Sequence, residues 1–168
     1  GFLSADLYVA GNNPAWQPSW FYAEGASRTL DDIIWPVANL LIHELAHAND
    51  AMPPALHNQV TRTNTPLDAT FLLERRSASY QLHSTYPLRS DLLYQLGAVL
   101  YQGEPANFLI RSLTPYEVGL EFAADDASAL YAYSSVYEDT AMLVEEVLTR
   151  HYFGLDRVAS FLDVPALE

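Results

Sequence analysis

The chain has 168 residues, of which 50% are hydrophobic and 17% are charged, so we expect one globular domain rather than a disordered chain. The chain contains arginine but no lysine, and its net charge is −13. This negative charge disfavours binding to nucleic acid or to anionic membranes. Cysteine is absent, and no apolar run is long enough for a membrane-spanning helix. Any transition-metal site must therefore use histidines and carboxylates.

The N-terminal third of the sequence predicts one strand and one long helix. Leu3–Val9 reads as a strand, and Gly11-Asn12-Asn13-Pro14 is typical of a turn. A helical pattern is clear from Val37 to about Ala51, and Pro53-Pro54 ends it. Just before this pattern, Pro36 either kinks an earlier helix or is the first residue of a new one.

Three later helices are predicted from residues that cap helix N-termini. Residues 55–88 give no clear pattern, and the caps lie beyond them. Thr114 and Ser135 each have a glutamate three residues later, which is the pattern of a capping box. We therefore expect an α+β, helix-rich domain with a small strand component at most. The predicted helices are Asp91–Gln102 after Ser90 and before Gly103, one that begins at Pro115 after Thr114, and one from Ser135 to about Tyr152 that Gly154 ends.

One short motif carries most of the functional information, because residues 43–47 read His-Glu-Leu-Ala-His. On an α-helix, His43 and His47 lie on one face, a turn apart, so both imidazoles can bind the same metal ion. Glu44 is rotated by about 100° from His43, so it can reach a metal-activated water without binding the metal. This arrangement is typical of a zinc hydrolase with a glutamate as general base. We therefore expect one Zn²⁺ per chain, with His43 and His47 as two of its ligands.

The rest of this helix gives two further expectations. Asp50 shares the histidine face, and a zinc-bound histidine usually donates its second N–H to a carboxylate or a carbonyl, so we expect Asp50 to orient a ligand histidine. Asn39 is a weaker candidate for that role. An apolar set on the opposite side of the helical wheel should pack into the core, leaving the histidine face in a cleft. This set is Val37, Leu41, Leu45 and Ala48.

A catalytic zinc site needs a third protein ligand. The extended metzincin motif would place glycine at position 50 and histidine at position 53, but the chain has Asp50 and Pro53, which excludes that class. The remaining histidines lack motif spacing and are more typical of surface or capping positions, so the third ligand should be a carboxylate from a second helix. These histidines are His57, His83 and His151.

The first candidate for the third ligand is Glu138, in Glu138-Asp139-Thr140-Ala141. Together, residues 43–50 and 131–145 resemble gluzincin-type zinc peptidases, in which an HExxHxxD helix is followed by a Glu-Asp-x-Ala helix. The zinc-binding metallopeptidases of bacterial envelopes and the catalytic domain of anthrax lethal factor look similar. The resemblance implies a zincin-like fold, Glu138 as the third zinc ligand, and Tyr131, seven residues earlier, facing the metal.

The sequence departs from that family at two positions. Thr140 stands where the family usually has an aromatic residue, and Met142 stands where it usually has a glutamate. Glu145 shares a face with Glu138 and could replace the missing glutamate.

A second candidate for the third ligand is Glu121, in Glu121-Phe122-Ala123-Ala124-Asp125. This segment resembles the Glu-x-x-Ala-Asp block of membrane-linked prenyl-protein and heat-shock zinc proteases, but those enzymes carry membrane helices. Glu74 is a more distant candidate, because the two arginines beside it favour a solvated face.

These observations predict a zinc metallopeptidase. Residues 1–168 would form a single zincin-like catalytic domain, which can be part of a longer protein, acting on a peptide or protein substrate. Glu44 would take the proton of a zinc-activated water and pass it to the leaving amine, while Tyr131 would donate a hydrogen bond to the oxyanion. Tyr133 and Tyr137 are alternatives to Tyr131.

Two other functions stay open at this point. A non-catalytic zinc-containing domain derived from a peptidase could bind a peptide or a glycan; the departures at Thr140 and Met142 favour it, and the intact Glu44 argues against it. Metal-dependent hydrolysis of a non-peptide amide is the other. The oligomeric state is not predicted, and the sequence leans towards a secreted or cell-envelope location, although this chain carries no signal segment.

Overall fold

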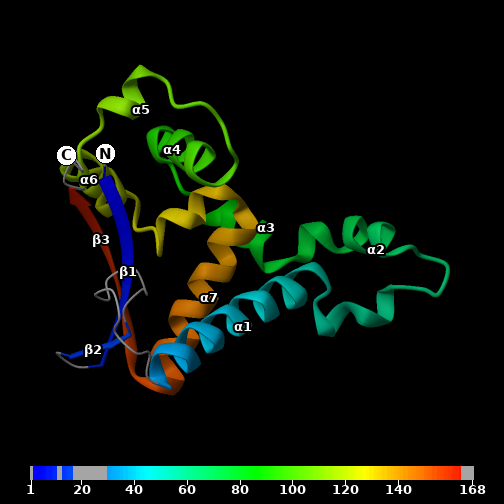
Figure 1. The fold of residues 1–168 in the computed structure, drawn as a ribbon. Coiled ribbons are helices and arrows are strands. Elements are labelled where there is room, and N and C mark those ends of the chain that lie inside the picture. The colour runs from blue at the N-terminus through cyan, green and yellow to red at the C-terminus, as the bar shows by residue number, and fades with distance from the viewer. Residues whose placement is uncertain (1, 11–12, 17–29, 164–168) are drawn as a thin grey trace.

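The computed structural model describes residues 2–10, 13–16 and 30–163, and within these ranges the chain is rich in helix (Figure 1). The α-helices are α1 (Asp31–Ala51), α2 (Pro66–Leu73), α3 (Ala78–Thr85), α4 (Asp91–Tyr101), α5 (Phe108–Ser112), α6 (Pro115–Asp125) and α7 (Val136–Phe153). The strands are β1 (Phe2–Ala10), β2 (Asn13–Trp16) and β3 (Leu155–Asp163), and the 3₁₀ turns are η2 (Pro54–Gln59), η3 (Glu74–Arg76) and η4 (Leu130–Ser134). Among the helices of the described ranges, none combines the length and apolar character that crossing a bilayer requires.

The strands form one antiparallel sheet in the order β2-β1-β3. The predicted strand Leu3–Val9 is confirmed as β1. Asn13 and Pro14, which were expected in a turn, instead begin β2, and the other two residues of that predicted turn, Gly11 and Asn12, lie outside the described residues. Strand β3 was not predicted, and it pairs with β1 over its whole length, from Phe2 opposite Asp163 to Ala10 opposite Leu155. The two strands lie side by side along one side of the molecule (Figure 1), so residues near the two ends of the described chain are joined.

The three helix starts predicted from capping residues, Ser90, Thr114 and Ser135, are confirmed. Ser90 caps α4 by accepting a hydrogen bond from the Leu93 amide at 3.2 Å, and Gly103 follows with a φ of 77°. Thr114 and Glu117 form a complete capping box at the start of α6. At the other end of the chain, Gly154 ends α7 in the left-handed conformation, with a φ of 64°, which glycine adopts without strain. Helix α1 begins earlier than Val37 and contains Pro36 within it.

The main apolar core lies between α4, α5, α6 and η4. Its buried members are Leu93, Leu96, Ile110, Val118, Leu130 and Tyr133, and Phe161 of β3 packs against them. Gly97 of α4 touches η4 closely, because a Cβ atom there would lie 3.1 Å from both Cβ and the carbonyl oxygen of Tyr133. This core fixes η4, and with it the residues that lead into α7.

Helices α1 and α7 pack against each other (Figure 1). Their contact includes buried polar groups. Asn39 accepts a hydrogen bond from the Thr149 hydroxyl at 3.1 Å, and both residues are buried. His43 is also buried in this contact, with 7% of its surface exposed. Buried polar groups are tolerated when each has a partner, and here the two helices supply partners for each other.

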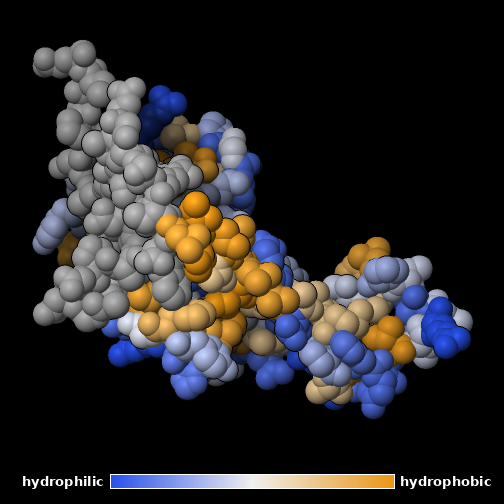
Figure 2. All heavy atoms as spheres, turned by 60° about the horizontal axis from the view of Figure 1, so that its bottom comes forward, coloured by the Kyte–Doolittle hydropathy of each residue, from blue (hydrophilic) through white to orange (hydrophobic). Residues whose placement is uncertain are grey.

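The expectation that the apolar side of α1 packs into the core was therefore wrong. Val37, Leu41 and Leu45 are each more than half exposed, whereas Asn39, His43 and Asp50 are buried. The physical reason is that the polar side finds hydrogen-bonding partners on α7 and α3, which sequence periodicity cannot reveal. Apolar residues gather on the surface seen in Figure 2. Those exposed along α1 are Leu30, Ile33, Ile34, Val37, Leu40, Leu41 and Leu45.

Candidate metal centre

The histidines of the His-Glu-Leu-Ala-His motif converge on one point. His43 and His47 lie one turn apart on α1, and their Nε2 atoms are 3.1 Å from each other. The rings meet edge to face, with centroids 4.7 Å apart. Imidazole Nε2 atoms that point at each other in this way share the region in which a metal ion could be bound.

Glu138 completes the cluster from the first turn of α7. Its Oε2 lies 2.9 Å from His43 Nε2 and 3.2 Å from His47 Nε2. Ser135 caps α7 by accepting a hydrogen bond from the Glu138 amide at 3.2 Å. This cap fixes the backbone of Glu138, while its side chain points at the histidines. Within the described ranges, His43, His47 and Glu138 are the residues whose ligand atoms gather closely enough to hold a metal ion.

The donor set and its spacing fit zinc. In a tetrahedral zinc site with bonds of about 2.0–2.2 Å, neighbouring ligand atoms lie about 3.3–3.6 Å apart. The three atoms here are separated by 2.9, 3.1 and 3.2 Å, so they would have to move apart by a few tenths of an ångström to surround the ion. Two imidazoles and one carboxylate are also the ligands of one class of catalytic zinc site, which leaves a fourth position for water.

A second carboxylate lies behind His43, and it belongs to Glu145, the residue expected to replace the missing glutamate, rather than to Asp50. Oε2 of Glu145 is 3.3 Å from His43 Nδ1, and its Oε1 accepts a hydrogen bond from Nη2 of Arg157 at 3.1 Å. Asp50 instead accepts hydrogen bonds from the backbone amide and the hydroxyl of Ser79, at the start of α3. The expectation that Asp50 orients His43 is therefore corrected: sharing a helix face did not tell which neighbouring helix each residue would meet.

Glu44 and Tyr131 lie beside the cluster. Glu44 is exposed, and the ring centroid of Tyr131 is 6.2 Å from that of His43. Burial raises the pKa of Tyr131, and the Glu138 charge, a hydrogen bond to Glu138 and the Glu44 charge raise it further. The phenol therefore keeps its proton at neutral pH and can donate a hydrogen bond. Tyr101 packs edge to face against Tyr131, with centroids 4.8 Å apart, and helps to hold it.

The alternative ligands lie elsewhere. Glu121 accepts a hydrogen bond from the Ser90 hydroxyl at 2.7 Å, and its neighbour Asp125 binds the backbone amides of Arg89 and Ser90. Glu74 is exposed. Tyr133 is buried and donates to Asp125 at 2.8 Å, while Tyr137 is 47% exposed. The other histidines are exposed and stand outside the cluster: His57, His83 and His151.

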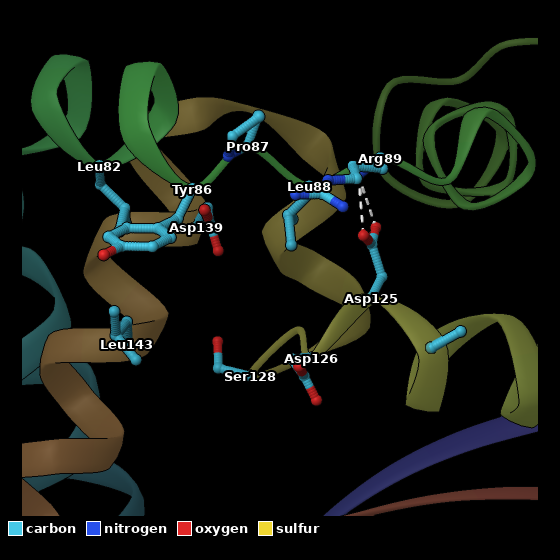
Figure 3. Close-up of a pocket in the computed structure, with 11 residues that line it drawn as sticks. Leu82, Tyr86, Pro87, Leu88, Arg89, Asp125, Asp126, Ser128, Asp139 and Leu143 are labelled. Carbon is cyan, nitrogen blue, oxygen red and sulfur yellow. Dashed lines mark hydrogen bonds between the residues drawn. The ribbon is translucent and has the colours of Figure 1, made fainter.

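A separate acidic cavity of about 310 Å³ lies between the end of α3, the end of α6 and α7 (Figure 3). Asp126, Ser128 and Asp139 line it together with apolar residues such as Leu143, and Asp125 is held there by the amide of Arg89. Burial raises the pKa of Asp139. The residues of the metal cluster are not among those that line this cavity.

Comparisons with known proteins add no assignment: no family model, curated protein or solved structure matches this chain. The resemblance to gluzincins therefore stays a prediction. Arg157 is the site residue that sequence reasoning missed. A single arginine in an unpredicted strand gives no pattern, and the packing of β3 against α7 brings it beside Glu145.

Proposed function

We propose that this domain is a zinc-dependent metallopeptidase. The observation that carries the proposal is the convergence of His43 Nε2, His47 Nε2 and Glu138 Oε2 within 3.2 Å of one another, from two helices far apart in the sequence. The intact Glu44 and the position of Tyr131 support a catalytic role rather than a structural one, because a purely structural site needs neither residue. The resemblance of both segments to gluzincins, and the zincin-like fold that it implies, point the same way.

The residues suggest a division of roles. His43, His47 and Glu138 would hold Zn²⁺, which supplies an activated water and polarises the substrate carbonyl. Glu44, one residue after the first ligand and free of the cluster, takes the proton of the attacking water and passes it to the leaving amine. Tyr131 donates a hydrogen bond to the developing oxyanion. This division makes the general base separable from the ligands by mutation.

The test combines metal analysis with peptide cleavage. Purified protein loaded with zinc is assayed on a mixed peptide library, before and after treatment with a strong chelator. We expect close to one zinc per chain and cleavage that the chelator abolishes and zinc restores. Glu44→Gln should keep its zinc and lose cleavage by about 10²–10⁴-fold, because the base is removed and no ligand is. Glu121→Gln is the matched control and should cleave like the wild type.

Three results would contradict the proposal. Absence of zinc from the wild type would remove the metal centre, and loss of zinc from Glu44→Gln would make that residue a ligand. Zinc held at full occupancy with no cleavage of any peptide would instead favour the non-catalytic binding domain.

A further inference from the structure

The imidazole of His43 is enclosed by carboxylates on both of its nitrogen atoms. Nε2 faces Glu138 at 2.9 Å, and Nδ1 lies 3.3 Å from Oε2 of Glu145. The side chains of His43 and Glu145 are 9% and 7% exposed, so little water can compete for Nδ1. Glu138 and Glu145 stand two turns apart on α7, which places one on each side of the ring.

Glu145 is in turn held in place by a residue of strand β3. Nη2 of Arg157 donates to its second oxygen, Oε1, at 3.1 Å, and the arginine side chain is 4% exposed. Arg157 reaches this place because alternate residues of a strand share a face, and Leu155 and Phe161 on the same face of β3 are turned inward. The two oxygens of Glu145 thus have different neighbours, one on β3 and one on α1.

We propose that Glu145, anchored by Arg157, is a positioning residue that fixes the orientation and the tautomer of His43 for metal binding. The inference rests on the metal centre proposed above. A histidine that binds a metal through Nε2 carries its remaining proton on Nδ1, and a carboxylate that accepts this proton makes the ring a better ligand. Asp50 is committed to Ser79, so among the contacts described Glu145 is the carboxylate that faces His43 Nδ1.

The test measures zinc affinity by competition with a chelating dye. Glu145→Gln keeps the size of the side chain but leaves a neutral amide between two donors, and we expect its zinc dissociation constant to rise about 10–100-fold. Glu121→Gln is the matched control, since it makes the same chemical change on a helix away from the cluster, and it should bind zinc like the wild type. Proton NMR of the zinc-loaded protein adds a direct readout. The His43 Nδ1–H signal should lie far downfield in the wild type and move upfield, with faster exchange, in Glu145→Gln.

A buried arginine left without its partner could by itself destabilise the domain. The double variant Glu145→Gln with Arg157→Met removes both charges, and it should recover thermal stability while still binding zinc 10–100-fold more weakly. Zinc affinity within about twofold of the wild type in either variant, or an unmoved Nδ1–H signal, would overturn the inference. Absence of zinc from the wild type would instead overturn the metal centre, so the two failures are distinguishable.

Discussion

Glu138 occupies a position where its side chain has two possible partners. In α6, the glutamate at the equivalent position, Glu117, turns back and accepts a hydrogen bond from the Thr114 amide at 2.9 Å. The Glu138 amide likewise donates a hydrogen bond to the Ser135 hydroxyl. Its carboxylate, however, lies against His43 and His47 instead of turning back to the Ser135 amide. A helix cap of this kind contributes about 1 kcal/mol. That the carboxylate faces the histidines at such a position supports a role as a ligand.

The choice between Glu138 and Glu121 gives a prediction for single residues. Glu138→Ala should abolish tight zinc binding, because one of three protein ligands is removed. Glu121→Ala should bind zinc as the wild type does, because that carboxylate only accepts a hydrogen bond from Ser90. Zinc content after dialysis and a competition titration measure both. Loss of zinc from Glu121→Ala with retention in Glu138→Ala would contradict the cluster.

Much of the metal cluster could be predicted from the sequence because its information is local. His43, Glu44 and His47 lie within five residues, and helical geometry alone relates them. Glu138 was predicted as the third ligand from the resemblance of a second short segment to gluzincins. Composition and spacing alone did not decide between Glu138 and Glu121. The roles of Asp50 and Glu145 depend on how helices pack, and a sequence does not state which helices are neighbours.

Among the elements, η4 depends on α4 for its position. Gly97→Ala would place a Cβ 3.1 Å from the Tyr133 carbonyl oxygen and from its Cβ, so η4 must shift. We expect a loss of about 1–3 kcal/mol in the free energy of unfolding, measured by urea denaturation. Gly119→Ala in α6 is the control, because its nearest neighbour would be Phe161 Cδ2 at an ordinary 3.7 Å. That variant should be neutral or more stable, since alanine favours a helix interior. Equal effects of the two substitutions would contradict the packing.

The start of α4 gives a prediction about pH. Burial opposes ionisation of Asp125, but hydrogen bonds from the Ser90 and Arg89 amides and the Tyr133 hydroxyl, with the Arg89 charge, outweigh it and lower its pKa below 3.8. The stabilisation that comes from this ionised group is therefore present above pH 3.8 and is lost as the pH falls through the lowered value. Asp125→Asn should cost about 1–3 kcal/mol at pH 7.

The difference between Asp125→Asn and the wild type should shrink as unfolding is followed from pH 7 to pH 2.5. Asp126→Asn is the control. That residue is exposed and adopts a φ of 53°, which asparagine tolerates, so the variant should be as stable as the wild type at pH 7. A difference for Asp125→Asn that stays constant with pH would refute the contribution of the charge.

The capped helix starts were predictable because the capping side chain and the backbone amide that donates to it lie within four residues of each other. Strand β3 was not, because Arg157 points inward and Val158 is 43% exposed, which reverses the usual alternation of apolar and polar residues. The prediction of which side of α1 is buried failed for a similar reason. Its buried side is polar and is compensated by partners on α3 and α7, such as Ser79 and Thr149, which lie far away in the sequence.

At the scale of the molecule, the cluster joins α1 to α7, two neighbouring helices (Figure 1) that lie far apart in the sequence. A metal that binds the folded state and not the unfolded chain stabilises the domain by about 2.7 kcal/mol at a free concentration of 100 times the dissociation constant. For a domain of this size, that gain should raise the melting temperature by about 5–11 °C. Calorimetry of the metal-free protein with and without zinc measures the shift. His47→Ala should show almost none, and a full shift in that variant would place zinc elsewhere.

The long sequence separation within the cluster also has a consequence for the order of events during synthesis. His43 and His47 are 95 and 91 residues away from Glu138. Strand β1 can pair with β3, at the far end of the described chain, only after β3 has been synthesised. A nascent chain that has not yet reached α7 therefore carries two histidines without their carboxylate. Contacts over such distances form late, since the loop between them must first be closed. We expect the domain to be unable to cleave anything, itself or its neighbours on the ribosome included, until almost all of it has emerged and folded.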